Sequence, residues 1–245
     1  MSDDFIQAYR TRAHRYPKPS VTVDLVVFTM LEGDLQVLLI ERAEPPFQGQ
    51  WALPGGFVRV GDSFDDPGES LEQAARRELA EETGLALEDA WLEQVGAFGD
   101  PGRDPRMRII SIAYTALLRP SLAPRIGAGS DASDARWWPM TALPALAFDH
   151  ADILHAAHLH LRARLYSSAI AFELVPESFT VAELRRVYQA ILAEELDAGN
   201  FRRHFRRLQA DGVLVEAPGR RLTPTKPAKL FRFSGTSGGG TSKTG

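Results

Sequence analysis

The amino-acid sequence predicts an α/β domain followed by a smaller helical domain that ends in a β-hairpin. The chain has 245 residues, more than one domain usually contains, which favours two domains. Its first part mixes strand-like and helix-like segments, whereas its last part has two helical segments and then two strand-like ones. Residues 1–172 hold 16 Lys and Arg against 24 Asp and Glu, while residues 173–245 hold 12 against 8. We therefore expect the basic second domain to suit a polyanion such as nucleic acid.

The composition excludes several classes of protein. With 44% hydrophobic and 24% charged residues, the chain is neither disordered nor fibrous. No apolar run reaches the roughly 18 residues of a membrane span, and residues 1–19 carry charges where a signal peptide would be apolar. We expect a cytoplasmic protein with no membrane partner. Because there is no cysteine, any metal must be held by oxygen or imidazole ligands.

The first domain is expected to begin with a hairpin, in which Val21–Met30 and Leu35–Ile40 flank a turn at Glu32–Gly33–Asp34. The following segment, Pro45–Gly68, is rich in Pro and Gly and is predicted to be loop or broken strand. Ser70 and Gln73 then form a capping-box sequence, which predicts a helix that stops at Gly84. A further strand is predicted over 109–118 and a further helix over 149–165.

Three glutamates stand out on the helix predicted after Ser70. On a helical wheel Glu78 and Glu82 project from the same face as Leu71, Ala75 and Leu79, with Glu81 beside them. Unpaired buried carboxylates are costly and repel one another, so this arrangement calls for a divalent cation, and oxygen ligands favour Mg²⁺ or Mn²⁺. The alternative is a solvated helix end whose acids pair with Arg76 and Arg77.

The residues around this helix resemble a known family motif. The run from Arg77 to Leu85, with Glu69 after Gly68, resembles the Nudix box, and Leu53–Val58 resembles the strand that enters it. The resemblance implies an α/β/α sandwich with a mixed sheet, and a ligand in which a nucleoside diphosphate is linked to another group. It implies that Glu78, Glu82, Glu81 and the carbonyl of Gly56 hold the metal. It also implies that Glu81 is the catalytic base and that Arg77 orients the glutamates.

One departure from the family pattern concerns spacing. In the family five residues separate a glycine from the first glutamate of the box, whereas here twelve residues separate Gly56 from Glu69, a surplus of seven. If the surplus loops out, Gly56 can still reach the metal. If it does not, the site is expected to bind its ligand but to turn over slowly.

Three further residues are candidates for ligand binding. Arg103 and Arg106 lie in a segment that, with Leu146–His150, resembles the ADP-ribose-type branch of Nudix proteins, and they are suited to clamp phosphates. The alternative is a salt-bridged turn that uses Asp100 and Asp104. Trp51 is suited to stack on an adenine, but a core position is the alternative.

The second domain has the plan of a winged helix-turn-helix. A capping box at Thr180 opens one helix, and Asp197 is expected to cap a second in which Phe201, Phe205 and Leu208 share a stripe. A hairpin follows, with strands expected at Val213–Glu216 and Leu230–Phe233 and a basic loop that runs through Arg220 and Arg221 to Lys229. A solvated charged face is the alternative reading. The residues expected to contact DNA are Asn200, Arg202, Arg203, Arg206, Arg207, Arg220, Arg221, Lys226 and Lys229.

The chain as a whole resembles the Nudix-related transcriptional regulators of NAD metabolism, through the segments already quoted and through His14–Phe28 and Phe179–Phe233. The resemblance implies a homodimer that binds double-stranded operator DNA and whose Nudix domain senses ADP-ribose or a related derivative of NAD. The predicted organisation is an N-terminal arm over 1–20, a Nudix domain over 21–168, a winged helix-turn-helix over 169–234 and a flexible tail over 235–245.

Three functions remain open from the sequence. The first is a regulator whose Nudix domain binds ADP-ribose with Mg²⁺ and also hydrolyses it to AMP and ribose 5-phosphate, since all three glutamates of the box remain. The second is a Mg²⁺-dependent ADP-ribose pyrophosphatase with an accessory basic domain and no regulatory role. The third is a pure sensor made inert by the surplus residues.

Overall fold

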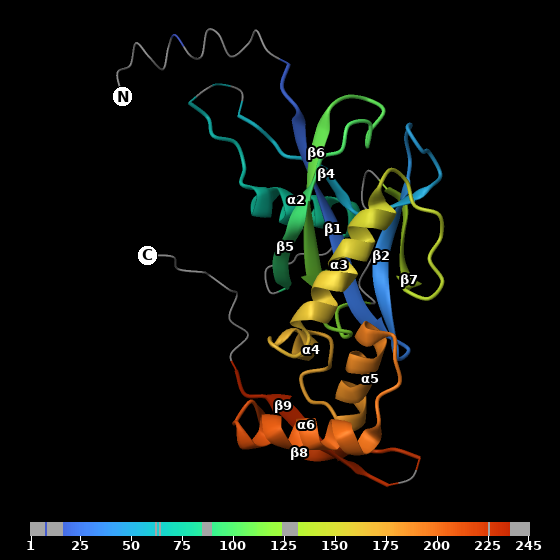
Figure 1. The fold of residues 1–245 in the computed structure, drawn as a ribbon, viewed down its shortest axis with the longest axis vertical. Coiled ribbons are helices and arrows are strands. Elements are labelled where there is room, and N and C mark those ends of the chain that lie inside the picture. The colour runs from blue at the N-terminus through green and yellow to red at the C-terminus, as the bar shows by residue number, and fades with distance from the viewer. Residues whose placement is uncertain are drawn as a thin grey trace.

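A computed structural model describes residue 8 and residues 17–61, 63, 65–84, 90–123, 132–224 and 226–235. Most of the predicted N-terminal arm and tail lies outside these residues. Figure 1 shows an α/β domain stacked on a smaller domain that contains α5, α6 and the β8–β9 hairpin. Within the described part of the chain, no helix has the length and apolar character needed to span a bilayer.

The first domain is built on one mixed sheet. Its described strands are β1 (Ser20–Leu31), β2 (Asp34–Arg42), β3 (Trp51–Ala52), β4 (Gly55–Phe57), β5 (Trp91–Phe98), β6 (Ile109–Leu117) and β7 (Ala132–Pro139). The order is β3-β2-β1-β6-β5, with β4 paired to β1 and β7 paired to β2. Strands β1 and β6 are parallel and the other pairs are antiparallel. The expected mixed sheet is therefore confirmed.

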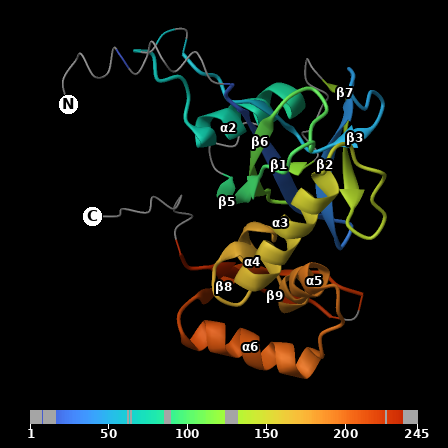
Figure 2. The ribbon, with the colours of Figure 1, turned by 45° about the horizontal axis from the view of Figure 1, so that its top comes forward.

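Strand β1 is buried on both faces, so its residues alternate between two cores. Val23, Leu25 and Val27 face helix α2 (Leu71–Thr83) and its residues Ala74, Ala75 and Leu79. Val26, Phe28 and Met30 face helix α3 (His150–Arg164). The two helices therefore cover opposite faces of the sheet, as in the expected α/β/α sandwich (Figure 2).

The ends of α2 agree with its sequence signals. The Ser70 hydroxyl accepts a hydrogen bond from the Gln73 amide at 3.2 Å, and the Gln73 side chain accepts one from the Ser70 amide at 2.7 Å. The helix stops where Gly84 adopts a left-handed conformation with φ 71° and donates its N–H to Ala80. The predicted start and end of this helix are confirmed.

The second domain comprises α4 (Ile170–Glu173), α5 (Val181–Leu192), α6 (Ala198–Ala210), β8 (Leu214–Arg221) and β9 (Ala228–Phe233). Thr180 caps α5 and Asp197 caps α6, as predicted. A bridge between Phe179 and Phe231 adds a third segment to the hairpin. This is the expected winged helix-turn-helix. One correction is needed: the hairpin strands are longer than predicted, so Arg220, Arg221 and Lys229 lie in strands and not in the loop.

Three elements were not predicted from the sequence. Strand β5 contains Glu93, Gln94 and Gly96, and β7 contains charged residues, so neither shows the alternation of a strand. They form because β6 and β2 offer them edges on which to pair. Helix α4 is four residues long, which is too short for a helical period to be visible in the sequence.

The two domains share one hydrophobic core. Leu161 and Leu165 of α3 belong to the same cluster of buried residues as Ile170, Tyr188 and Phe201 of the second domain. Two polar contacts reinforce this packing: His158 Nε2 lies 2.8 Å from the Ile191 carbonyl, and the Tyr188 hydroxyl donates to the Leu165 carbonyl at 3.4 Å. The domains are therefore joined by packing as well as by the chain.

Replacing Phe201 by Ala should lower the free energy of unfolding by about 3–5 kcal/mol, because a buried aromatic side chain is removed and a cavity is left. Phe201 is 4% exposed and packs edge-on against Tyr188, with ring centroids 5.2 Å apart. Urea denaturation would measure the change. Leu159→Ala is the control, since Leu159 is 51% exposed and should change the free energy by less than about 0.5 kcal/mol. Equal effects of the two substitutions would contradict the packing described here.

Candidate functional site

A cleft of about 430 Å³ opens in the first domain, between α2 and the strand ends β1, β2 and β4. Its other wall is formed by two loops, one around Arg103–Arg106 and one around Phe148–His150. The charged residues that line it are Asp24, Arg42, Arg59, Arg77, Glu78, Glu81, Glu82, Arg103, Asp104 and Arg106. The structure thus brings together the predicted glutamates and both predicted phosphate-binding arginines.

The guanidinium of Arg77 organises the acidic side of the cleft. It forms a bidentate pair with Glu69, with Nη2–Oε1 at 2.5 Å and Nε–Oε2 at 2.9 Å. Its Nη1 donates to Glu78 at 2.6 Å and to Glu81 at 3.0 Å, and its Nη2 donates to the Phe57 carbonyl at 3.0 Å. The hydrogen bond that Arg77 donates to Glu69 is the main reason that the pKa of Arg77 is raised. The arrangement supports the orienting role expected for Arg77.

The three glutamates of α2 differ in their surroundings. Glu82 is buried and accepts a hydrogen bond from the Gly55 amide at 2.8 Å. Glu78 lies against Gly56, where an added Cβ would come within 2.5 Å of its Oε1, so only glycine allows this approach. Burial raises the pKa of Glu78 even though Arg77 opposes the shift. Glu81 is the most accessible and also pairs with Arg59 at 3.0 Å.

The two ends of the segment that holds the surplus residues are hydrogen-bonded to each other. The Glu69 amide donates to the Arg59 carbonyl at 3.0 Å, and the Arg59 amide donates to the Glu69 carboxylate at 2.7 Å. The chain therefore leaves at Arg59 and returns at Glu69, as if the residues between them had been inserted. Gly56 consequently remains beside Glu78, which is the arrangement the family pattern requires.

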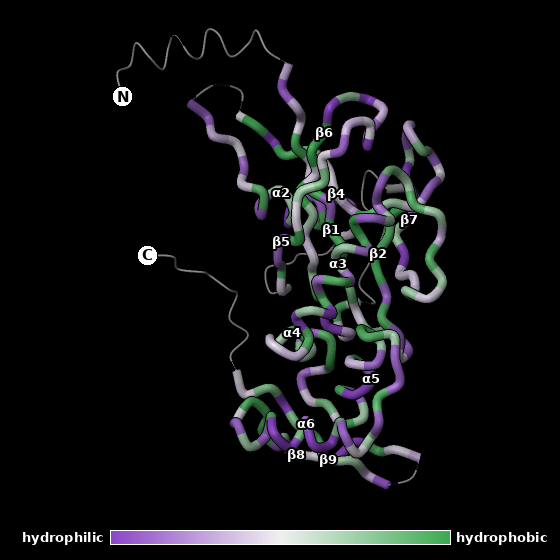
Figure 3. Tube along the Cα trace, viewed as in Figure 1, coloured by the Kyte–Doolittle hydropathy of each residue, from purple (hydrophilic) through white to green (hydrophobic). Residues whose placement is uncertain are grey.

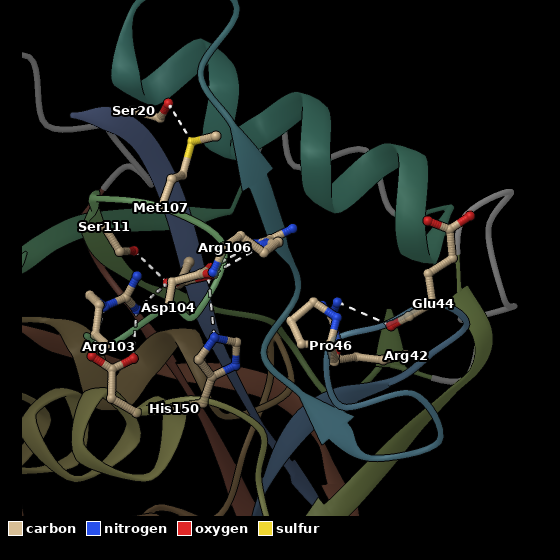
Figure 4. Close-up of polar contacts among 12 residues, drawn as sticks. Ser20, Arg42, Glu44, Pro46, Arg103, Asp104, Arg106, Met107, Ser111 and His150 are labelled. Carbon is tan, nitrogen blue, oxygen red and sulfur yellow. Dashed lines mark hydrogen bonds and ion pairs between the residues drawn. The ribbon is translucent and has the colours of Figure 1, made fainter. Parts of the chain in front are cut away.

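A buried network forms the floor of the cleft (Figure 4). Asp24 accepts a hydrogen bond from Ser111, and its carboxylate lies 3.5 Å from the guanidinium of Arg103. Arg103 also forms a bidentate pair with Asp149, with N–O distances of 2.6 and 2.7 Å. Burial alone would lower the pKa of Arg103, but Asp149 and Asp24 raise it. For Arg103 the alternative of a turn salt-bridged through Asp100 and Asp104 is not observed, since its ion pairs are with Asp149 and Asp24. Arg103 builds the floor of the site, and its side chain is 5% exposed.

His150 completes this floor. Its Nδ1 accepts a hydrogen bond from the Leu53 amide at 2.9 Å, and its Nε2 lies 3.7 Å from Asp24. Burial lowers the pKa of His150, so the neutral imidazole is favoured. By holding Leu53, His150 fixes the start of the segment that carries Gly55 and Gly56. The sequence analysis missed this role, because the two partners are 97 residues apart.

The loop wall of the cleft combines cations and an aromatic ring. Arg106 pairs with Asp104 at 2.7 Å, as in the alternative reading of that turn. The guanidinium carbons of Arg42 and Arg106 lie 4.8 and 5.7 Å from the ring centroid of Phe148. Arg42 donates to the Pro46 and Glu44 carbonyls and has no carboxylate partner among the described residues. Arg42 was not among the predicted residues, because a lone arginine after a strand carries no pattern.

Trp51 lies outside the lining of this cleft. Its ring packs edge-on against Trp138, with centroids 5.2 Å apart, and Arg136 lies 5.6 Å over it. This placement agrees with the core alternative for Trp51 and gives no support to stacking on adenine.

The donor chemistry of the acidic wall fits Mg²⁺ or Mn²⁺. Carboxylate oxygens of Glu78, Glu81 and Glu82 face one cleft, and burial disfavours the charge of Glu78 in the absence of a counterion. Among the described residues, no three Asp, Glu or His side chains are already clustered as a metal centre. Arg77 and the Gly55 amide hold the carboxylates in this structure.

A second candidate site lies on α6, where hydrophilic residues dominate (Figure 3). Phe201 and Phe205 are buried, while the arginines on the opposite side are exposed and form no ion pair with the described part of the chain. These exposed arginines are Arg202, Arg203, Arg206 and Arg207. Asn200, also predicted to contact DNA, is exposed and accepts a hydrogen bond from Arg203. The predicted basic face is thus present.

The predicted basic residues of the hairpin differ in their exposure and in their partners. Arg220 and Lys226 are exposed. Arg221 pairs with Glu183 at 2.8 Å and donates to the Ser178 carbonyl at 2.8 Å, so it fastens the hairpin to α5. Lys229 pairs with Glu216 across the hairpin at 2.9 Å. Two of the four hairpin cations that were predicted to contact DNA are therefore engaged within the domain.

Comparison with known proteins bears on both sites. Residues 20–157 match the NUDIX domain, and residues 171–233 match the NrtR DNA-binding winged helix domain. The chain is 35% identical over 219 residues to the ADPR responsive transcriptional repressor NtrR of Acinetobacter baylyi, covering 89% of this chain and 84% of that protein. It is 38% identical over 149 residues to an ADP-ribose pyrophosphatase of Methanocaldococcus jannaschii, covering 61% and 76%.

Comparison with solved structures agrees with these two family matches. NrtR of Shewanella oneidensis, in complex with a 27mer DNA, superposes with a TM-score of 0.72 and 32% identity, covering 87% of this chain and 93% of that one. The NUDIX domain of the same protein in complex with ADP ribose gives a TM-score of 0.51 at 32% identity, covering 66% and 99%.

His150→Gln should flatten the pH dependence of stability on the acid side. The folded-state pKa of His150 is lowered, so folding favours the neutral imidazole. The contribution of His150 to the free energy of unfolding is therefore complete above the ordinary histidine pKa near 6.5 and is lost as the pH falls below that value. Urea denaturation at pH 7.5 and about 5.5 would show a smaller loss in the variant than in the wild type. His155→Gln, at an exposed position of the same helix, should behave like wild type. An unchanged pH dependence in His150→Gln would rule out the buried neutral imidazole.

Proposed function

Because this chain belongs to the Nudix family and carries an NrtR-type winged helix domain, we propose that it is a DNA-binding transcriptional regulator that responds to ADP-ribose or a related derivative of NAD. One observation carries the proposal: the chain that forms the glutamate-lined cleft also presents four exposed arginines on α6, which form no ion pair with the residues that the structure describes. We also propose that the boundary between the Nudix domain and the winged helix domain lies between residues 168 and 169.

The cleft suits a nucleoside diphosphate derivative. Its volume of about 430 Å³ lies in the range of small-molecule sites. Arg42 offers a guanidinium that forms no ion pair with a described carboxylate, and Arg106, 40% exposed, reaches the same space, so both can contact phosphate oxygens. Arg103 is held in the floor and supports the site from below. The NrtR NUDIX domain solved with ADP ribose supports this choice of ligand.

We further propose that the site hydrolyses ADP-ribose to AMP and ribose 5-phosphate. Glu78 and Glu82, with help from Glu81 and the Gly56 carbonyl, would hold Mg²⁺ or Mn²⁺. Such an ion neutralises a pyrophosphate and lowers the pKa of a water molecule. Glu81 is the best placed of the three to accept a proton, since it is the most accessible, and Arg77 keeps its carboxylate turned toward the cleft. The similarity to an ADP-ribose pyrophosphatase supports this step.

For DNA we propose that α6 enters the major groove. Asn200 lies in its first turn and Arg202, Arg203, Arg206 and Arg207 line its exposed side, which is where a recognition helix contacts bases and phosphates. Arg220 and Lys226 of the hairpin are free to contact the adjacent backbone. A homodimer would present two such helices to two half-sites of an operator. The NrtR structure solved with DNA supports this partner.

A second candidate function is a Mg²⁺-dependent ADP-ribose pyrophosphatase whose basic domain has no regulatory role. The observation that favours it is the complete set of box glutamates, arranged around Arg77 and undisturbed by the surplus residues. The two candidates differ in whether the arginines of α6 bind operator DNA.

Replacing Arg203 and Arg206 by Ala should weaken DNA binding and reduce its salt dependence. Each lost phosphate contact should lower the slope of log K against log salt by about 0.9. Fluorescence anisotropy with promoter DNA at several salt concentrations would measure both effects, while the affinity for ADP-ribose should not change. Arg76→Ala removes a paired arginine on α2 and serves as the control. If the double variant binds DNA as wild type does, the regulator proposal fails.

Glu82→Gln should abolish Mg²⁺-dependent release of AMP from ADP-ribose, because it removes a carboxylate charge needed by the metal while keeping the shape of the side chain. Glu72→Gln is the matched control on the same helix, since Glu72 is 61% exposed and pairs with Arg76 at 2.9 Å. Chromatographic detection of AMP would measure turnover. Equal rates in wild type and Glu82→Gln would refute the catalytic part of the proposal and leave ligand binding to be judged by calorimetry.

A further inference from the structure

A second cleft, of about 860 Å³, lies between the two domains. One wall is the turn that joins β1 to β2, and the other is α5, with His158 of α3 and Met140–Thr141 between them. Both ribbon views place the β1–β2 turn beside α5 (Figures 1 and 2). The cleft therefore separates the ligand-binding domain from the first helix of the helix-turn-helix.

Opposite charges face each other across this cleft. Glu32 and Asp34 lie on the turn, and Arg185 and Arg186 lie on α5. None of the four forms an ion pair within the described part of the chain, and the Arg185 Nε is buried without a hydrogen-bond partner. The other acids of the cleft are engaged, because Glu194 lies 3.7 Å from Arg162 and Glu195 accepts a hydrogen bond from Gln189. Charges of opposite sign in this position attract each other across the gap.

Two continuous elements connect this cleft to the ligand cleft. Strands β1 and β2 line the ligand cleft with Asp24 and Arg42 and line the second cleft with the turn at their other end. Helix α3 does the same, with His150 in the ligand cleft and His158 in the second one. A shift of either element at the ligand site is therefore transmitted to the space between the domains.

Helix α5 is the element of the second domain that lines this cleft, and α6 is packed against it. Leu184, Tyr188 and Ile191 of α5 pack in one core with Phe201 and Phe205 of α6. Because that core continues into α3, the movement is a small sliding of packed helices and not a free hinge. Glu32 and Ala193, on the two walls, both adopt left-handed backbone with φ 54° and 55°, a strained state that is often found at switch regions.

We propose that Glu32 and Asp34 form an electrostatic latch with Arg185 and Arg186, open in this structure and closed when the ligand cleft is occupied. Closure draws α5 toward the β1–β2 turn and re-orients α6 relative to DNA. The latch rests on the proposed function, since it is the physical link by which ADP-ribose changes DNA affinity. A ligand shifts such an equilibrium only by its difference in affinity for the two states.

The test compares Glu32→Lys/Asp34→Lys with Glu72→Lys/Asp100→Lys, which changes the net charge equally at positions outside this cleft. The measured quantity is the ratio of DNA dissociation constants with and without saturating ADP-ribose. Coupling of this kind is typically about 5–150-fold. We expect the ratio to fall to near 1 in the turn variant and to stay at the wild-type value in the control. Adding Arg185→Glu/Arg186→Glu to the turn variant should restore it.

A ligand-independent measurement separates failure of the latch from failure of the proposed function. The chain has no cysteine, so spin labels at Ala142→Cys and Ala182→Cys, both exposed, report the width of the second cleft. In ligand-free wild type the minor closed population should shrink between about 50 and 500 mM salt, because screening weakens the attraction, so the mean distance should lengthen. The turn variant should not respond. A wild-type distance that responds neither to salt nor to ADP-ribose overturns the latch. Absence of any binding to ADP-ribose or DNA, with the salt response present, refutes the proposed function alone.

Discussion

The ligand site depends on the guanidinium of Arg77. Three glutamates from the box and its approach, Glu69, Glu78 and Glu81, contact this one group, which also bonds to the carbonyl of Phe57 in β4. Without it, carboxylates of like charge would be left close together in a partly buried corner, an arrangement that costs several kcal/mol. The same contacts tie α2 to the strand that carries Gly55 and Gly56. The positions of these carboxylate oxygens are thus set by contacts within the protein.

The other organising constraint is the sharing of elements between sites. Strand β1 contributes side chains to both cores of the sandwich, and its far end forms the turn that faces α5. Helix α3 begins at the floor of the ligand cleft and ends in the core of the winged helix domain. A ligand that rearranges Asp24, Asp149 or His150 therefore acts on elements whose other ends contact the DNA-binding module. No separate relay is required.

The elements that could be predicted are those whose start and end are determined by neighbouring residues. The hairpin at Glu32–Asp34, the capped helix from Leu71 to Thr83 and the two helices of the second domain each carry their own start and stop signals. Strands β5 and β7 were not predicted, because they form by pairing with β6 and β2 and show no alternation of polar and apolar residues of their own. The helical wheel placed Glu78 and Glu82 correctly. The partner of Arg103 is Asp149, 46 residues away, and the partner of Arg221 is Glu183, 38 residues away. Contacts at such separations exist only once the fold has formed.

The closure of the backbone between Arg59 and Glu69 has an evolutionary consequence. Since the two residues meet through a pair of hydrogen bonds, the length of chain between them can drift without disturbing the helix that follows. The segment between them is thus a permissive point for insertions at the rim of the cleft, where added residues would leave the glutamate-bearing helix in place. The same point would accept an engineered peptide or a circularly permuted fluorescent reporter of nucleotide occupancy.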